Sequence, residues 1–180
     1  DKSKEFYDLP LTNIVFMGMG EPLLNYKNVI RSIHFITSEE GLQMSYKRVT
    51  LSTSGIAKMI RRLADDKVKV NLALSLHAAS EKIRNEIMPI GDANSLEDLR
   101  DSLKYYFSKT KNKITYEYVL LKDVNDSISE AEKLYRFTKH IPSKVNLIEY
   151  NPVEGLGFDK SSPENTDAFV DFLDNKGVNV

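Results

Sequence analysis

The stretch VNLALSLH, residues 70–77, indicates the fold class of this chain. Its apolar residues are too continuous for a strand that exposes one face to water. They are typical of a strand buried on both faces of a parallel sheet. Four more runs share this pattern, at residues 13–20, 48–54, 114–121 and 144–152. The sequence therefore predicts five strands in one parallel sheet.

Segments with helical periodicity separate these strands. They cover residues 26–38, 55–66, 95–110, 127–141 and 162–177, and a further short helix is expected near 80–86. Ser95 and Ser162 suit the N-cap positions of two helices, because a serine hydroxyl accepts a hydrogen bond from a free backbone N–H. The alternation of strand and helix predicts right-handed βαβ units. Two α/β architectures fit: an arc of a (β/α) barrel and an open doubly wound sheet.

The composition excludes several kinds of site. The chain has 180 residues, 41% hydrophobic and 28% charged, which suits one globular domain with a core. It has no cysteine, so no disulfide or thiolate metal site forms within it, and its three histidines lack the spacing of metal ligands. A net charge of −1 gives no electrostatic argument for nucleic acid binding. No secretory signal is visible, and no apolar stretch approaches the roughly 20 residues that span a bilayer.

Polar residues close the predicted strands. In both architectures, function gathers at the carboxyl ends of the strands. Residues 18–21, 52–55, 75–77 and 149–152 occupy these positions. We expect them to face one cavity that is rich in hydroxyls, amides and glycine backbone, with one carboxylate and no obvious nucleophile–base pair. Such groups suit a polar small molecule that carries an amine, a carboxylate and a ribose.

The loop GMGEP, residues 18–22, leaves two interpretations open. It is not a phosphate-binding Walker A loop, because no Gly-Lys-Ser/Thr follows, and Leu23 replaces the third glycine of a GxGxxG fingerprint. Glycine backbone can approach a ligand closely, and Glu21 could accept a hydrogen bond from an ammonium group. The alternative is a tight turn with a surface glutamate. Arg84 also has two possible interpretations, as a surface helix residue or as an anion clamp.

Six motifs, in order, resemble one family. They are VFMGMGEPLLN (15–25), VTLSTSG (49–55), LALSLHA (72–78), RNEIMPI (84–90), YEYVLLKDVND (116–126) and IEYNP (148–152). Together they look like the radical S-adenosylmethionine RNA methyltransferases that modify adenosine at C2, the RlmN-type enzymes. The related C8-methylating enzymes are near neighbours, but the proline after GMGE and the following LLN look more like the C2 group. The resemblance covers about residues 11–180.

The resemblance implies a partial (β/α) TIM-like barrel of about five consecutive βα units, with S-adenosylmethionine across the strand ends. Glu21 and Gly20 match the family's contact to the methionine amino group, and the other residues match cofactor-lining positions. Carried over by motif, the implied cofactor-binding residues are Gly20, Glu21, Ser52, Ser75, Leu76, His77 and Asn151. The same polar strand-end positions emerged from the parallel-sheet argument, but their ligand comes from the resemblance alone.

The absence of cysteine departs from the family pattern. The family holds a [4Fe-4S] cluster on a Cys-x3-Cys-x2-Cys motif before the GMGE strand, and two further cysteines serve methyl transfer. This sequence contains none of them and starts at Asp1. We therefore expect residues 1–180 to be a central part of the radical SAM core. The upstream cluster-binding segment, the accessory domain and the downstream cysteine-bearing segment would lie elsewhere. This part alone is expected to be inactive.

The resemblance also implies a reaction and partners. The parent enzyme would methylate C2 of adenosine in 23S rRNA and tRNA through a 5′-deoxyadenosyl radical and a methylated cysteine. It would work in the cytoplasm, away from any membrane, with an electron donor such as flavodoxin. The alternatives are another radical SAM enzyme, either a C8 methyltransferase or an activase, and a non-catalytic nucleotide-binding barrel domain. An arc of barrel strands exposes an edge and apolar surface, so we expect self-association or marginal stability.

Overall fold

One parallel sheet of five strands forms the centre of the molecule. The computed structural model describes residues 9–88 and 94–180. The strands are β1 (Ile14–Phe16), β2 (Val49–Thr53), β3 (Asn71–Ser75), β4 (Ile114–Leu120) and β5 (Ser143–Glu149). They lie in the order β1-β2-β3-β4-β5, and every neighbouring pair is parallel. The predicted five-stranded parallel sheet is confirmed, although several strands end before the apolar run does because the chain turns into the site loops.

Helices follow the strands as the periodicity predicts. The helices are α2 (Tyr26–Thr37), α3 (Ala57–Asp65), α4 (Glu81–Ile87), α5 (Leu96–Thr110), α6 (Ile128–Thr138) and α7 (Pro163–Asn175), with short 3-10 helices η1 (Pro22–Asn25) and η2 (Tyr46–Arg48). The hydroxyls of Ser95 and Ser162 accept N–H groups three residues later, which confirms both as N-caps. Residues 89–93, which include the last two residues of the RNEIMPI motif, lie outside the described residues.

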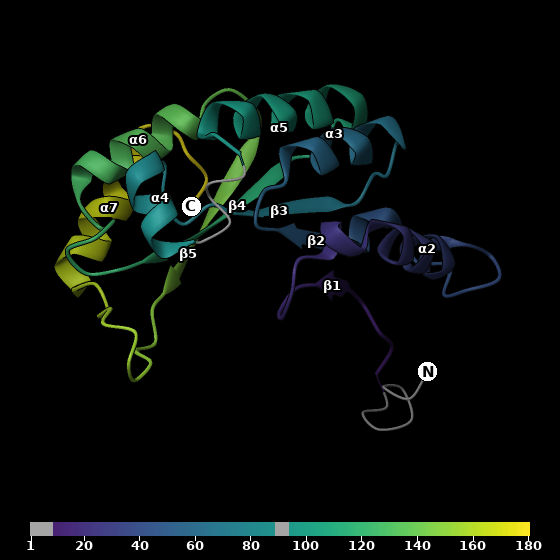
Figure 1. Ribbon diagram of the computed structural model, residues 1–180, viewed down its shortest axis with the longest axis horizontal. Helices are drawn as coiled ribbons and strands as arrows, with labels where there is room; N and C mark the ends of the chain where they lie inside the picture. Colours follow the sequence, from purple (N-terminus) through teal and green to yellow (C-terminus); the bar gives the residue numbers. More distant parts are fainter. Residues whose placement is uncertain (1–8, 89–93) are drawn as a thin grey trace.

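The strand order decides between the two architectures. A doubly wound sheet reverses its strand order at a switch point, whereas here each crossover moves to the next strand in one direction. Figure 1 shows the sheet as an arch, with α2, α3, α5 and α6 along its outer side, and none of the described helices covers the inner side of β1 and β2. The structure is therefore an arc of a (β/α) barrel, which confirms the partial barrel.

The two faces of the sheet differ in chemistry. Alternate residues point to the helices and form the core, including the fully buried Leu51, Leu74 and Tyr116. Most of the residues between them on the same strands are small or polar, such as Ser52 and Ala73. Because the inner face carries small and polar side chains, and no helix within residues 9–88 and 94–180 covers it at β1 and β2, that part of the fold can receive a ligand.

The edge strands are less buried than the pattern predicts. The central strands β2, β3 and β4 are largely buried on both faces, but β1 and β5 are partly exposed because each has only one neighbour. Val15 on β1 is 57% exposed, and Met17 and Met19 beside it are also exposed. The predicted self-association through this apolar edge stays a prediction.

Candidate functional site

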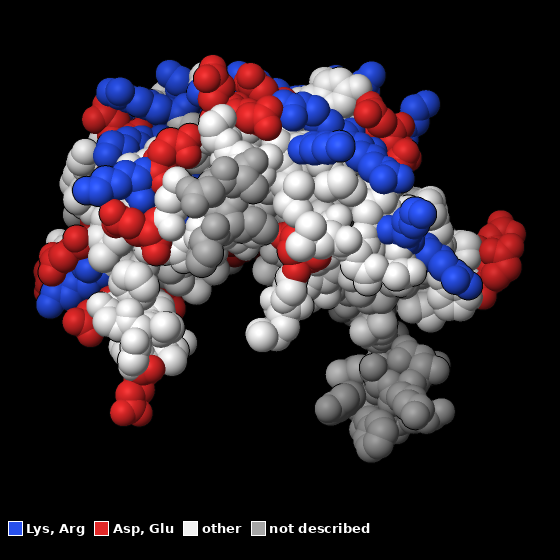
Figure 2. All heavy atoms as spheres, viewed as in Figure 1, with Lys and Arg blue, Asp and Glu red and all other residues white. Residues whose placement is uncertain are grey.

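A cavity of about 520 Å³ lies at the carboxyl ends of β1, β2 and β3. Its lining residues are Phe16, Met17, Gly18, Gly20, Glu21, Pro22, Ser52, Thr53, Ser54, Ser75, His77, Ile87 and Met88. The set combines hydroxyls, a carboxylate and an imidazole with apolar walls, as small-molecule sites usually do. Lys, Arg, Asp and Glu gather over the outer helices in Figure 2, whereas the inner side is mostly uncharged. A cavity therefore lies at the ends of three of the predicted strands, but residues 149–152 are not among those that line it.

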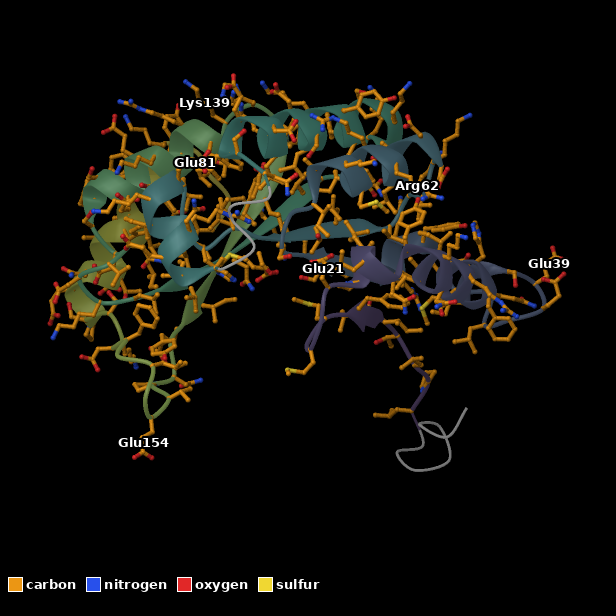
Figure 3. The ribbon with its side chains drawn as sticks, viewed as in Figure 1. Glu21, Glu39, Arg62, Glu81, Lys139 and Glu154 are labelled. Carbon is orange, nitrogen blue, oxygen red and sulfur yellow. The ribbon has the colours of Figure 1, made fainter. Side chains whose placement is uncertain are left out.

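The Glu21 carboxylate joins the glycine loop to β2. Its Oε1 accepts hydrogen bonds from the Leu23 N–H and the Thr53 hydroxyl, each at 2.9 Å. Its Oε2 accepts the Ser54 N–H and the Ser54 hydroxyl, each at 2.7 Å. A carboxylate offers about four acceptor positions, and all four are filled from within the protein. Glu21 is thus no loose surface side chain, and Figure 3 shows it on the inner side of the arch.

The loop before Glu21 depends on glycine. Gly18 and Gly20 have φ angles of 116° and 85°, a region that residues with a Cβ rarely adopt. These two turns bring the backbone of residues 18–20 to the cavity wall, where both glycines line the space. The GMGE motif therefore encodes a backbone shape together with the side chain that fastens it to the neighbouring strand.

His77 has an uncommon backbone conformation, and a hydrogen bond fixes the tautomer of its neutral ring. Its φ is 55°, an uncommon value for a residue other than glycine. Its Nδ1 accepts the Val119 N–H at 3.1 Å, so the neutral ring carries its proton on Nε2. Nε2–H is then the remaining polar group of a side chain that lines the cavity. His77 can act as a neutral hydrogen-bond donor to a ligand.

A buried asparagine holds the His77 turn. Asn125 is fully buried, and its Nδ2 donates to the backbone oxygens of His77 and Val119 at 2.7 and 2.8 Å. Its Oδ1 accepts the Leu121 N–H at 2.7 Å. Sequence reasoning missed this residue, although it belongs to the KDVND turn that follows a predicted strand. Turns of that composition often use an Asn side chain to satisfy nearby backbone groups.

Arg84 lies behind the cavity, in the interior. It is 1% exposed, and its Nη2 donates to the Ser54 carbonyl oxygen at 2.6 Å. Burial lowers the pKa of its guanidinium, and the nearby Glu81 carboxylate partly offsets this effect. The interpretation of Arg84 as a surface helix residue is therefore wrong. It contacts the backbone of a residue that lines the cavity.

The predicted site residues do not all reach the cavity. Gly20, Glu21, Ser52, Ser75 and His77 line it. Leu76 is fully buried in the hydrophobic core, because consecutive residues of a strand point to opposite faces. Asn151 is exposed and follows β5, on the far edge of the sheet. Leu76 is therefore not among the residues that line the cavity, and Asn151 is separated from the cavity by β4.

The titration of His77 gives a pH test of its burial. Burial, and secondly the positive charge of Arg84, lower the pKa of His77 from 6.5 to about 4. Between these values the unfolded chain binds more protons, so the stability that neutral His77 contributes is complete above pH 6.5 and is lost as the pH falls toward 4.

We expect the stability difference between the wild type and His77→Asn to shrink over that pH range. Urea unfolding at several pH values measures this difference, because the other titrating groups are common to both proteins. A difference that stays constant with pH would show that His77 titrates normally.

The described residues 9–88 and 94–180 contain no group of three or more His, Cys, Asp or Glu side chains that could hold a metal ion. The sequence has no cysteine either. No helix in the same two ranges is long and apolar enough to cross a membrane.

Comparisons with known proteins show the family to which the chain belongs. The family model described as the radical SAM superfamily matches residues 1–137. A probable dual-specificity RNA methyltransferase RlmN of Christiangramia forsetii is 52% identical over 180 residues, which are 100% of this chain and 51% of the relative. The protein of the same name from Flavobacterium psychrophilum is 54% identical over 177 residues, 98% of this chain and 51% of the relative. The chain thus spans about half the length of these curated relatives.

Solved structures share the fold. A radical SAM methyltransferase from Sphaerobacter thermophilus superposes with a TM-score of 0.93 at 36% identity, covering 99% of this chain and 52% of that one. A structure described as native anSMEcpe with bound AdoMet superposes with a TM-score of 0.58 at 14% identity, covering 96% of this chain and 50% of that one. The second likeness shows the fold alone.

Proposed function

This chain belongs to the radical SAM superfamily and is of the RlmN type, and on that basis we propose that the protein methylates C2 of adenosine in 23S rRNA and tRNA, with S-adenosylmethionine as cofactor. The observation that carries the proposal is the cavity itself. Three separate motifs, GMGE, STS and SLH, place Glu21, Ser52 and His77 around one space at the carboxyl ends of parallel strands. This is where barrel folds bind their ligands.

The groups around the cavity fit S-adenosylmethionine. When bound, the cofactor would supply the methyl group and the sulfonium centre from which the radical is generated. The Ser52 and Ser75 hydroxyls and the Nε2–H of His77 would bind its carboxylate and ribose. The apolar side chains of Phe16 and Met88 would exclude water from one side.

Gly20 and Glu21 would hold the amino group of the cofactor. Because four donors already fill the Glu21 carboxylate, an ammonium group has to replace one of them. The Ser54 hydroxyl is the donor that can leave, since it rotates about one bond while the Ser54 N–H keeps its place on Oε2. Leu76 would contribute through its backbone. Asn151 would reach the cofactor only from the far side of β4, which makes it the least supported of the proposed contacts.

A [4Fe-4S] cluster does not fit the residues of this chain. Its thiolate ligands need cysteines, and the 180 residues include none. We propose that residues 1–180 form part of a radical SAM core, with the cluster ligands and the methyl-carrying cysteine in other parts of the protein. The chain by itself would then bind the cofactor without cleaving it. Cleavage of S-adenosylmethionine by the isolated chain after iron–sulfur reconstitution would contradict this.

The RNA partners follow from the names of the relatives, which are dual-specificity RNA methyltransferases. We propose 23S rRNA and tRNA as substrates, a flavodoxin-type electron donor, and a cytoplasmic location where both RNAs are made. The protein would act without a membrane partner.

Product analysis tests the proposed function directly. The whole protein is incubated anaerobically with a reductant, S-adenosylmethionine and 23S rRNA or tRNA, and the nucleosides are analysed by mass spectrometry. We expect 2-methyladenosine. Formation of 8-methyladenosine would identify the C8 methyltransferase alternative. Absence of any methylated adenosine, with the cluster shown to be intact, would reject the proposal.

A further inference from the structure

Arg84 opens the RNEIMPI motif, of which Ile87 and Met88 line the cavity whereas Arg84 itself does not. It lies on α4, is almost fully buried, and is absent from the residues that line the cavity. A buried guanidinium is costly unless it is hydrogen-bonded. Arg84 donates from Nη2 to the Ser54 carbonyl oxygen at 2.6 Å. That contact reaches a residue that does line the cavity.

Ser54 is bound on both sides by groups of opposite charge. The Arg84 guanidinium binds its carbonyl oxygen, and the Glu21 carboxylate binds its N–H and its hydroxyl. Thr53, next to it, donates its hydroxyl to Glu21 and accepts the Gly55 N–H at 3.0 Å. The turn at the end of β2 is therefore clamped between α4 and the glycine loop.

We infer that Arg84 is a positioning residue for the proposed cofactor site, acting through Ser54 on Glu21 and the glycine loop. The inference rests on the proposed function for the identity of the ligand. It explains why three motifs far apart in the sequence form a single site. RNEIMPI supplies the Arg84 cation, STS supplies the turn at Ser54, and GMGE supplies the Glu21 carboxylate. Removal of Arg84 leaves the Ser54 turn free to move, and Glu21 moves with it.

Arg84 could instead serve only to anchor α4, and two variants separate these roles. Arg84→Met keeps the length of the side chain but removes the donor. Arg84→Lys restores a charged donor, which suffices because the contact with Ser54 is a single hydrogen bond. Arg61→Met is the matched control, since Arg61 binds Asp98 on the outer helices, away from the cavity.

The affinity of the whole protein for S-adenosylmethionine, measured by calorimetry, is the first readout. We expect Arg84→Met to weaken binding roughly tenfold, as for the loss of one charged hydrogen bond. Arg84→Lys should recover part of that loss, and Arg61→Met should bind like the wild type. Unchanged binding by folded Arg84→Met, or equal weakening by Arg61→Met, would overturn the inference.

Thermal unfolding without ligand is the second readout, and it holds even if the proposed function fails. Arg84→Met and Glu21→Gln are combined, and the shifts in midpoint temperature are compared. If Arg84 acts through Ser54 on Glu21, Glu21→Gln lowers the midpoint temperature much less in the Arg84→Met protein than in the wild type. Additive shifts would overturn the inference. If the wild type binds no S-adenosylmethionine but the two substitutions are still coupled, the proposed ligand is rejected, whereas the positioning role of Arg84 stands.

Discussion

Replacement of Asn125 by alanine is expected to lower the free energy of unfolding by about 4 kcal/mol, because three backbone groups around this fully buried side chain lose their hydrogen-bond partner at once. The Leu121 N–H and the carbonyl oxygens of His77 and Val119 each lose their side-chain partner. Asn125 is 0% exposed, so water cannot replace these hydrogen bonds in the folded state. Urea unfolding followed by circular dichroism measures the loss.

Asn125→Ala should lower the ligand affinity of the site as well as the stability of the fold. The His77 turn, with its φ of 55°, is held by the Asn125 amide, and without it the imidazole loses its fixed direction. We therefore expect reduced affinity for S-adenosylmethionine at temperatures where the variant is still folded. Asn125→Asp, which keeps the size but turns an oxygen toward two carbonyls, should be at least as harmful.

Asn112→Ala is the matched control. Its Nδ2 also donates to two backbone oxygens, those of Lys69 and Val70, but at the amino ends of the strands and partly exposed to water. We expect a loss of about 1 kcal/mol and unchanged ligand affinity. Equal losses in the two alanine variants would show that burial of the Asn125 network contributes little.

The sheet could be predicted from the sequence because its signal is repeated and local. Five apolar runs alternate with helical segments, and every additional unit strengthens the same interpretation. The choice of barrel over doubly wound sheet needed the strand order, which depends on contacts between distant segments. The buried face of a helix follows less directly from its apolar residues: in α2 Ile33 is fully buried but Phe35 is 59% exposed, because two residues along a helix differ by about 200°.

The site could be predicted in part for the same reason. Parallel strands bring their carboxyl ends together, so Glu21, Ser52 and His77 could be expected near one another without any knowledge of their contacts. Strand alternation could also have excluded the Leu76 side chain, because Ser75 and His77 already face the cavity. The Asn125 network and the buried position of Arg84 could not be predicted, since each depends on partners about 30 to 50 residues away along the chain.

Glu21→Ala is expected to be the most damaging change within the site loop. It leaves the donors of Leu23, Thr53 and Ser54 without their acceptor and removes the N-cap of η1. We expect a loss of about 2–4 kcal/mol in stability, less than the number of bonds suggests because the open cavity admits water. Binding of S-adenosylmethionine should weaken by at least roughly tenfold.

Glu21→Gln tests the acceptor role more sharply, because glutamine has nearly the same shape as glutamate and differs mainly in its hydrogen-bonding groups. An amide offers one oxygen and one NH2 group, so its NH2 must face donors at either Oε1 or Oε2, where the carboxylate accepted four hydrogen bonds. We expect Glu21→Gln to show a large part of the loss in stability that Glu21→Ala shows. Glu39→Gln, in the loop beyond α2 that Figure 3 shows far from the cavity, is the control and should behave like the wild type.

The comparison of stability with affinity separates two roles of Glu21. If the carboxylate only meets the cofactor's ammonium group, Glu21→Gln weakens binding and leaves the unfolding free energy unchanged. If it fastens the glycine loop to β2, as its four hydrogen bonds indicate, the same substitution lowers stability in the absence of any ligand. We expect the second result, because a ligand can use this carboxylate only after the protein has already bound it on both oxygens.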